Sequence, residues 1–369
     1  MLDPIIAFFQ RIFSAIGRGV GLVVAWLLWP FLAAHGWYKD RNWLIKGPII
    51  LVLAVLVASY GWFFWRTQIW YGFDTQMVEK YDFAKRTVAA GEKLPDQPNA
   101  CQNSAIATVA ADLTDLNVNQ NAWVSSTLLY KLGFFGIDWD NTPFFDNKAS
   151  FQRGVNQVVR RVAIELADNL GRVRGTSGIN SDLQEARGRI QYDEEAWYFG
   201  IHPLGFRSTT PATYRSAIRY WRQFNADLQQ CKSVFDTRAD NLMQLLDRAA
   251  SDLGNTSDIL RRRSEDYNAG WFDTRADDRF WFAYGQLYAL RAILAATHAD
   301  FQDVIRERNL QSLWMQTEEQ VEAALRVQPA IISNGAEDGW IMPTHLATMG
   351  FYILRVRSNM VELRTVLDR

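Results

Sequence analysis

Three aspartates in one short segment have a spacing that suggests metal binding. Asp138 and Asp140 lie two positions apart, as the first oxygen ligands of a calcium loop do, and Asp146 follows within the length of such a loop. The pattern then departs from that loop, because Pro143 stands where the tight turn requires glycine and Ala149 where the last glutamate would bind. Two interpretations therefore stay open: an ion site, or side chains that cap turns and the following helix.

A pair of glutamates offers a second kind of chemistry. Glu194 and Glu195 precede the aromatic residues Trp197, Tyr198 and Phe199. Enzymes that cleave glycans need a carboxylic acid, and aromatic rings can serve as platforms for sugars, so this segment is a candidate hydrolytic site. The alternative is a solvated helix end whose rings turn inward.

No other catalytic or metal pattern stands out. The four histidines, at positions 35, 202, 298 and 345, are too scattered to form a spaced metal motif. The sequence contains no HExxH, no CxxC and no glycine-rich phosphate loop. We therefore expect no cofactor.

The chain has two cysteines, Cys101 and Cys231. An even number of cysteines in an oxidising compartment favours a disulfide. Such a bridge would close a loop of roughly 130 residues and stabilise the fold by about 4 kcal/mol on the chain-entropy model. The alternative is two buried thiols, because the sequence does not show that the two residues approach each other. The helical period predicts that Cys231 faces the core.

The elements that must position these residues begin with an apolar stretch. Gly47 to Trp65 carries no charge and is bounded by Lys46 and Arg66. As a helix rising ~1.5 Å per residue it would reach roughly 28 Å, close to the ~30 Å hydrocarbon core of a bilayer. Aromatic residues at both ends are typical of a membrane interface, so we predict a transmembrane helix rather than a buried core helix. The residues expected in or beside the membrane are Trp43, Lys46, Pro48, Trp62 and Trp65.

Residues 1–46 form a separate segment before this span. Polar residues recur at helical spacing among apolar ones, so we predict an amphipathic helix from residue 4 to about residue 37 in the cytoplasmic interface. Gly19 to Tyr38 is also uncharged, and a second span there is the alternative, although Pro30 interrupts it. Both arrangements place the chain after Arg66 on the same side of the membrane.

The distribution of charge predicts which side that is. Residues 1–46 contain five Lys or Arg against two Asp, and an excess of basic residues marks the cytoplasmic end of a span. Residues 66–369 would then form a periplasmic domain of a bacterial inner-membrane protein, held by an uncleaved anchor. The chain has a net charge of −1, and its acidic residues prevail after Arg66, so nucleic acid is not an expected partner.

Helical periods dominate residues 66–369, and we predict an all-α domain of about eight helices with long antiparallel helices at its centre. Two heptad seams carry this prediction. The first runs from Thr210 to Gly254 with a bend or break at Arg238, and its apolar positions are Tyr214, Trp221, Leu228, Phe235, Leu242 and Ala249. The second closes the chain with Leu346, Met349, Ile353, Val356, Met360, Leu363 and Leu367.

Three further segments have distinct patterns. Tyr71 to Ala90 keeps a loose apolar stripe and is predicted to continue the membrane helix. Gly133 to Gly154 is aromatic and acidic, and we expect an ordered loop that packs on its own rings. Thr317 to Gln320 has the pattern of a capping box, which predicts the start of a helix.

Two adjoining blocks, WVSSTLLYKLG from Trp123 and GIDWDNTPFFDNKASFQRG from Gly136, resemble a family of proteobacterial inner-membrane proteins known only as a domain of unknown function. The resemblance extends over most of the chain. It implies a Gram-negative inner membrane and a periplasmic domain, and it supplies no activity and no catalytic residues.

These patterns favour a scaffold or accessory subunit of an envelope complex, with membrane lipid and an envelope protein or a second copy as partners. An enzyme acting on peptidoglycan through Glu194 or Glu195 is one alternative. A domain that holds a lipid or another apolar ligand between its helices is the other.

Overall fold

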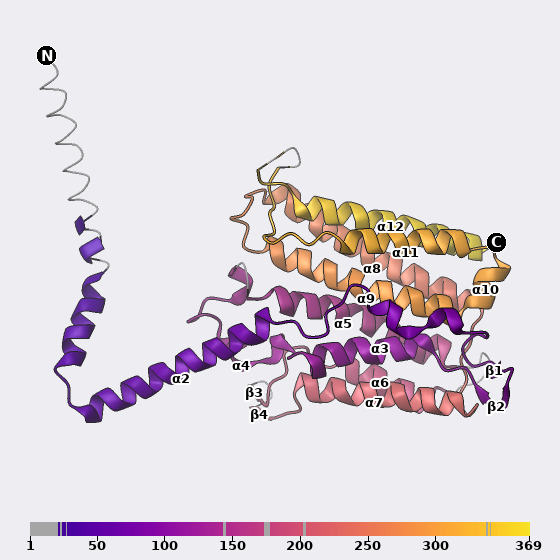
Figure 1. Cartoon of the computed structure of the whole chain (residues 1–369), viewed down its shortest axis with the longest axis horizontal. Coiled ribbons are helices and arrows are strands. Elements are labelled where there is room, and N and C mark those ends of the chain that lie inside the picture. The colour runs from indigo at the N-terminus through magenta and orange to yellow at the C-terminus, as the bar shows by residue number, and fades with distance from the viewer. Residues whose placement is uncertain are drawn as a thin grey trace, which may run out of the picture. The chain divides into compact units, whose positions relative to one another are not determined.

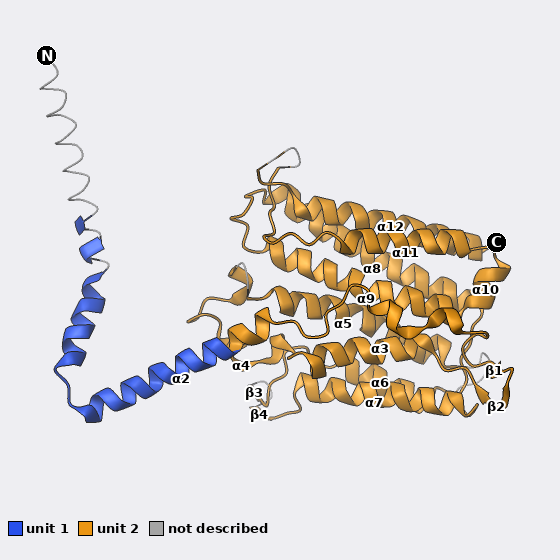
Figure 2. Cartoon of the chain, in the orientation of Figure 1, with its two compact units in different colours: residues 1–62 blue, residues 63–369 orange. Residues whose placement is uncertain are grey.

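The computed structural model describes residues 21–369 apart from 23, 27, 143–144, 173–177, 202–203, 337–338 and 340. The chain divides into two compact units, residues 1–62 and 63–369 (Figure 2). The predicted domain boundary at residue 66 lies close to this division. The predicted interfacial helix lies largely outside the described residues, since residues 1–20 are not among them.

The first unit contains helical residues 28–39 and most of α2, Trp43–Gln68. Within the part of the chain that the structure describes, one helix, α2, is long and apolar enough to cross a membrane. Its bounds contain the predicted span, and Pro48 lies inside it. Trp43 and Trp62 are exposed, as are nearly all α2 side chains.

The second unit is all-α, which confirms the predicted fold class (Figure 1). Its long helices run back and forth between the two ends of a bundle. Their bounds are α3 Ala105–Asp115, α4 Leu128–Leu132, α5 Asn147–Glu165, α6 Ser181–Ile190, α7 Thr210–Gln229, α8 Ala239–Asp266, α9 Ala276–Asp300, α10 Gln302–Glu307, α11 Gln311–Leu325 and α12 His345–Leu367.

Short elements connect these helices. Two antiparallel hairpins pair β1 Lys93–Leu94 with β2 Gln97–Cys101, and β3 Phe199–Ile201 with β4 Leu204–Phe206. The single-turn helices are η1 Met77–Tyr81, η2 Phe83–Lys85, η4 Val124–Ser126 and η5 Trp139–Asn141. Wider π-turns, η3 Leu116–Gln120 and η6 Leu166–Leu170, extend α3 and α5.

The core is centred on α9, which contacts α3, α5, α8, α11 and α12. The side chains of α9 are buried on nearly all sides of the helix, among them the fully buried Phe280, Tyr284 and Leu287. The α12 seam faces α8 and α11, and the prediction for it is confirmed. Its seven residues are all buried, namely Leu346, Met349, Ile353, Val356, Met360, Leu363 and Leu367.

Several predicted helix bounds were wrong. The helix predicted to span the membrane ends at Gln68 and does not continue through 71–90, because the chain turns at Gly72, whose φ of +65° is unfavourable for other residues. Gly254 lies inside α8 rather than at a helix end. Thr317 also lies inside a helix, α11, where its hydroxyl donates a hydrogen bond to the carbonyl oxygen of Leu313 and caps nothing.

The predicted position of Cys231 was also wrong. The predicted break at Arg238 is present, since α8 begins at Ala239, but α7 already ends at Gln229 and residues 230–238 form a connection. Cys231 lies in this connection with a φ of +54°, and its side chain is exposed rather than packed in the core. The heptad pattern does not extend through residues that are not helical.

Candidate functional site

One end of the helical domain receives the chain from α2, and we call it the entry end. Phe63, the first residue of the domain, is 1% exposed and packs its ring 4.8 Å from that of Trp139. The buried ammonium group of Lys148 donates hydrogen bonds to the carbonyl oxygens of Arg66 at 2.9 Å and Ile69 at 2.7 Å. These contacts satisfy carbonyl groups at the end of α2 and attach them to the start of α5.

The described residues of four connecting segments also lie at the entry end, within the ranges 116–146, 191–209, 267–275 and 326–344 (Figure 1). Contacts tie them together. The indole N–H of Trp123 donates to the carbonyl oxygen of Glu194 at 2.6 Å, and Gly270 pairs with Asn334 as an isolated β-bridge. The aromatic segment around Trp139 packs on its own rings, as predicted, with Phe134 and Phe145 in contact with that indole. The predicted loop is shorter than Gly133 to Gly154, however, because residues 147–154 belong to α5.

Exposed apolar side chains gather at this end. Several are far more exposed than is usual for their type, such as Phe206 at 91% and Phe272 at 82%. The set includes Phe64, Trp65, Leu128, Leu132, Phe134, Phe135, Ile137, Tyr198, Phe199, Leu204, Phe206, Tyr267, Trp271, Phe272, Ile331 and Ile341. In the described loops of the opposite end, the exposed large apolar residues are Ile179 and Val234.

The two candidate glutamates lie at the entry end within a network of ion pairs. Glu194 lies 3.0 Å from the guanidinium group of Arg160, and Glu195 lies 2.7 Å from that of Arg153. Lys131 reaches Glu195 from α4 at 3.6 Å. These contacts connect α4, α5 and the loop after α6, which gives the glutamate pair a structural role.

A second group of carboxylates lies at the same end. Asp140 in η5, Asp146 before α5 and Asp278 in the first turn of α9 each contribute one oxygen atom to a set whose members lie within 4.8 Å of one another. The hydroxyl groups of Tyr130 and Ser150 donate to Asp140 at 3.2 Å and to Asp278 at 3.1 Å. We call Asp140, Asp146 and Asp278 the carboxylate cluster.

The electrostatics of the carboxylate cluster are unfavourable when it holds no cation. Burial raises the pKa of Asp146, and the neighbouring charge of Asp278 raises it further. Burial also raises the pKa of Asp278, and it raises that of the adjacent Asp277 to about 8. The common cause is that acidic groups lie next to one another away from water.

The fold brings together two of the three aspartates that were predicted as metal ligands. Asp140 and Asp146 meet, whereas Asp138 is exposed and lies outside the group. Asp146 occupies the N-cap position of α5, but its side chain makes no capping hydrogen bond. Sequence reasoning missed Asp278, because its only signal was an acidic pair at the start of a helix far along the chain.

The cavity found inside the described helices is small. It lies among α5, α8, α9 and α12, is lined by residues such as Val162 and Leu290, and has a volume of about 30 Å³, far below the ~150 Å³ of a cavity that holds benzene. A larger groove of about 550 Å³ beside η2 is open and is lined in part by the charged side chains of Arg86, Arg291 and Glu318. Neither is suited to a buried lipid chain.

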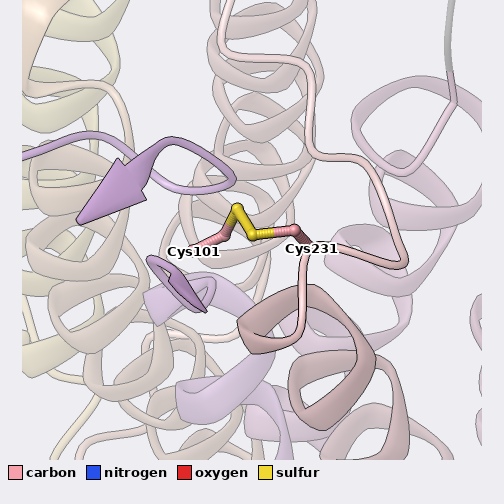
Figure 3. Close-up of a disulfide and its surroundings, with 2 residues drawn as sticks. All are labelled: Cys101 and Cys231. Carbon is pink, nitrogen blue, oxygen red and sulfur yellow. A yellow bond between two sulfur atoms is a disulfide. The ribbon is translucent and has the colours of Figure 1, made fainter. Parts of the chain in front are cut away.

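A disulfide joins Cys101 at the end of β2 to Cys231 after α7 (Figure 3). In Figure 1, β2 lies at the end of the domain opposite the entry end. The two Cα atoms lie 5.3 Å apart. Both described cysteines are therefore bonded, and the described chain has no free thiol.

The comparisons with known proteins identify a family but no activity. No curated protein and no solved structure matches the chain. A family model described as an uncharacterized protein conserved in bacteria, DUF2333, matches residues 90–270 and 261–369, which is most of the helical domain. The resemblance to a family of unknown function is thereby confirmed, and the chain belongs to this uncharacterised bacterial family.

Proposed function

We propose that the protein is a scaffold or accessory subunit of the bacterial envelope, anchored in the inner membrane by α2, with its helical domain on the periplasmic side. The observation that carries the proposal is the gathering of exposed apolar side chains at the entry end. Exposed apolar side chains that gather on one part of a protein are typical of a membrane or protein interface.

The occupant that fits this surface best is the lipid bilayer itself. The last residues of α2, from Phe63 on, belong to the helical domain, and by chain connectivity we expect the entry end to face the membrane that α2 crosses. Aromatic side chains are favoured at the boundary between headgroups and acyl chains. Within the helical domain, Phe63 packs on Trp139 and Lys148 donates a hydrogen bond to Arg66, so the last residues of α2 are held at the entry end.

A stripe on α12 supports the part of the proposal that concerns a protein partner. Phe351, Leu354 and Val361 are 55%, 49% and 40% exposed, on a face of α12 away from its buried seam. Their spacing of three and seven residues matches the pattern with which one helix packs against another. An envelope protein or a second copy of this chain would bury this stripe.

The membrane contact can be tested with single introduced cysteines, because Cys101 and Cys231 are bonded and leave no competing thiol. Phe206→Cys and Phe272→Cys place a probe at the entry end, and Val234→Cys is the matched control at the other end. Each variant of the full-length protein is labelled with an environment-sensitive fluorophore and placed in lipid nanodiscs. We expect spin-labelled lipids to quench residues 206 and 272 strongly and residue 234 weakly.

Equal quenching at all three positions would contradict the membrane contact. The partner surface needs a separate test, with a photo-cross-linking amino acid at Leu354 in native membranes and the same probe at the exposed Glu307 of α10 as control. A discrete adduct at residue 354 that is missing at 307 supports the scaffold. Its absence at both positions counts against a partner on α12.

A glycan-cleaving activity is not proposed, because both candidate glutamates are engaged in ion pairs between structural elements. An apolar-ligand carrier is not proposed either, because the enclosed cavity is too small for an acyl chain.

A further inference from the structure

Two buried carboxylates of the described chain, Asp273 and Asp300, are well supplied with hydrogen-bond donors. Asp300 has no exposed surface, and its carboxylate forms an ion pair with Arg86 at 3.0 Å. Its oxygens also accept hydrogen bonds from the hydroxyl group of Ser104 and from the backbone N–H groups of Ala105 and Ile106. These donors offset much of the cost of removing the charge from water.

Asp146 departs from this arrangement. Its side chain is 0% exposed, and neither carboxylate oxygen has a hydrogen-bond partner among the described residues. Asp277, next to the carboxylate cluster, is 5% exposed and equally unpartnered within the described part of the chain. Two buried acidic groups without donors call for a physical explanation, since such groups are rare in folded proteins.

Helix N-termini explain only part of this arrangement. Asp146 precedes α5, and Asp277 and Asp278 stand in the first turn of α9, where the helix dipole favours negative charge. The helix dipole stabilises a nearby negative charge only modestly, and it acts on exposed side chains as well. It does not explain why an oxygen of Asp146 lies among those of Asp140 and Asp278, turned away from solvent.

We propose that the carboxylate cluster is a site for a hard divalent cation, Ca²⁺ or Mg²⁺. The three oxygens come from three separate segments of the chain and lie within 4.8 Å of one another. Oxygen ligands stand ~2.1–2.5 Å from such an ion, so two ligands of the same ion are at most about 5 Å apart. All ligand atoms are oxygens, which these ions prefer over softer metals. The cation supplies the positive partner that the carboxylate of Asp146 does not find among the described residues.

The site gives the ion a structural role. It joins η5 to the starts of α5 and α9, and so fixes the loop between α4 and α5 that carries the exposed Phe134 and Phe135. This inference does not depend on membrane contact, because the ion site stands on the buried carboxylates.

The test uses the full-length protein in detergent, stripped of metal with a chelator, and equilibrium dialysis against radiolabelled calcium. We expect one ion per chain for the wild type and for Asp138→Asn, which removes an exposed aspartate of the same loop. Asp146→Asn and Asp140→Asn should each lower the affinity at least ~10-fold, as loss of a charged ligand does. Competition with magnesium distinguishes the two ions.

Thermal unfolding provides a second readout. Saturating Ca²⁺ or Mg²⁺ should raise the melting temperature of the wild type by roughly 5 °C and leave that of Asp146→Asn unchanged. Asp140→Asn serves in its place if Asp146→Asn does not fold. The proposal is overturned if the stripped wild type binds neither ion, or if binding persists unchanged in the Asp140 and Asp146 variants.

Discussion

Gly154 of α5 lies directly against the backbone of α9, where a Cβ atom at residue 154 would stand 2.0 Å from the carbonyl oxygen of Phe282. The relation is mutual, because a Cβ atom at Gly285 of α9 would stand 2.2 Å from the carbonyl oxygen of Phe151. Two glycines therefore allow the central helices to approach backbone to backbone, and a rigid main chain blocks any larger residue.

We predict that Gly154→Ala and Gly285→Ala each lower the free energy of unfolding by at least about 2 kcal/mol, because the two helices must separate. The matched control is Gly188→Ala in α6, where a Cβ atom meets nothing within 4 Å. That change should raise stability by about 0.5–1 kcal/mol through helix propensity. Denaturant unfolding of the full-length protein, followed by circular dichroism, measures all three. Wild-type stability in Gly154→Ala would disprove the close approach.

The fold class could be predicted from the sequence because the helical spacing of apolar residues is visible within each single helix. The α12 seam from Leu346 to Leu367 is buried as its heptads predict. Apolar periodicity gave a wrong prediction where tertiary contacts determine the backbone conformation. Residues 71–90 keep an apolar stripe, yet Phe73 and Met77 reach the core from an irregular chain that Asn121 holds at Tyr71.

The candidate ion site shows a different limit. Asp140 and Asp146 could be found because they are neighbours in the sequence, and local spacing is visible there. Asp278 could not, because only the packing of α9 against α5 brings it to them. Gly254 illustrates the same point for helix ends, since it lies inside α8 beside the side chain of Arg357.

Removing the disulfide should destabilise the domain through the unfolded state. Cys101 and Cys231 are 130 residues apart, and the chain-entropy model assigns a loop of that length about 4–5 kcal/mol. We predict a loss of this size for the Cys101→Ser, Cys231→Ser double variant in thermal or denaturant unfolding. The control is reductant, which should lower the stability of the wild type and leave the double variant unchanged. Rapid maleimide labelling of the native protein without reduction would contradict the bridge.

The hydrogen bonds that Asp273 accepts at the entry end predict that the stability of the domain depends on pH. Asp273 is 8% exposed and accepts hydrogen bonds from Arg263, at 3.0 Å to Oδ2, and from Asn334 at 2.8 Å. Burial acts to raise the pKa of Asp273, but the hydrogen bonds from Arg263 and Asn334 outweigh it, and the pKa is lowered. A carboxyl whose pKa is lower in the folded state adds stability above its unfolded pKa of about 3.9, and this stability is lost as the pH falls.

We therefore predict that Asp273→Asn lowers the free energy of unfolding by about 2 kcal/mol at neutral pH, because Arg263 loses its charged partner in a buried position. The difference from the wild type should shrink steadily as the pH falls below about 4, since the wild-type carboxyl then takes up a proton. Asp266→Asn, at an exposed position in the last turn of α8, is the matched control and should follow the wild type at every pH. Denaturant unfolding across this pH range measures the effect. A difference that stays constant with pH would mean that the charge of Asp273 does not hold the two loops together.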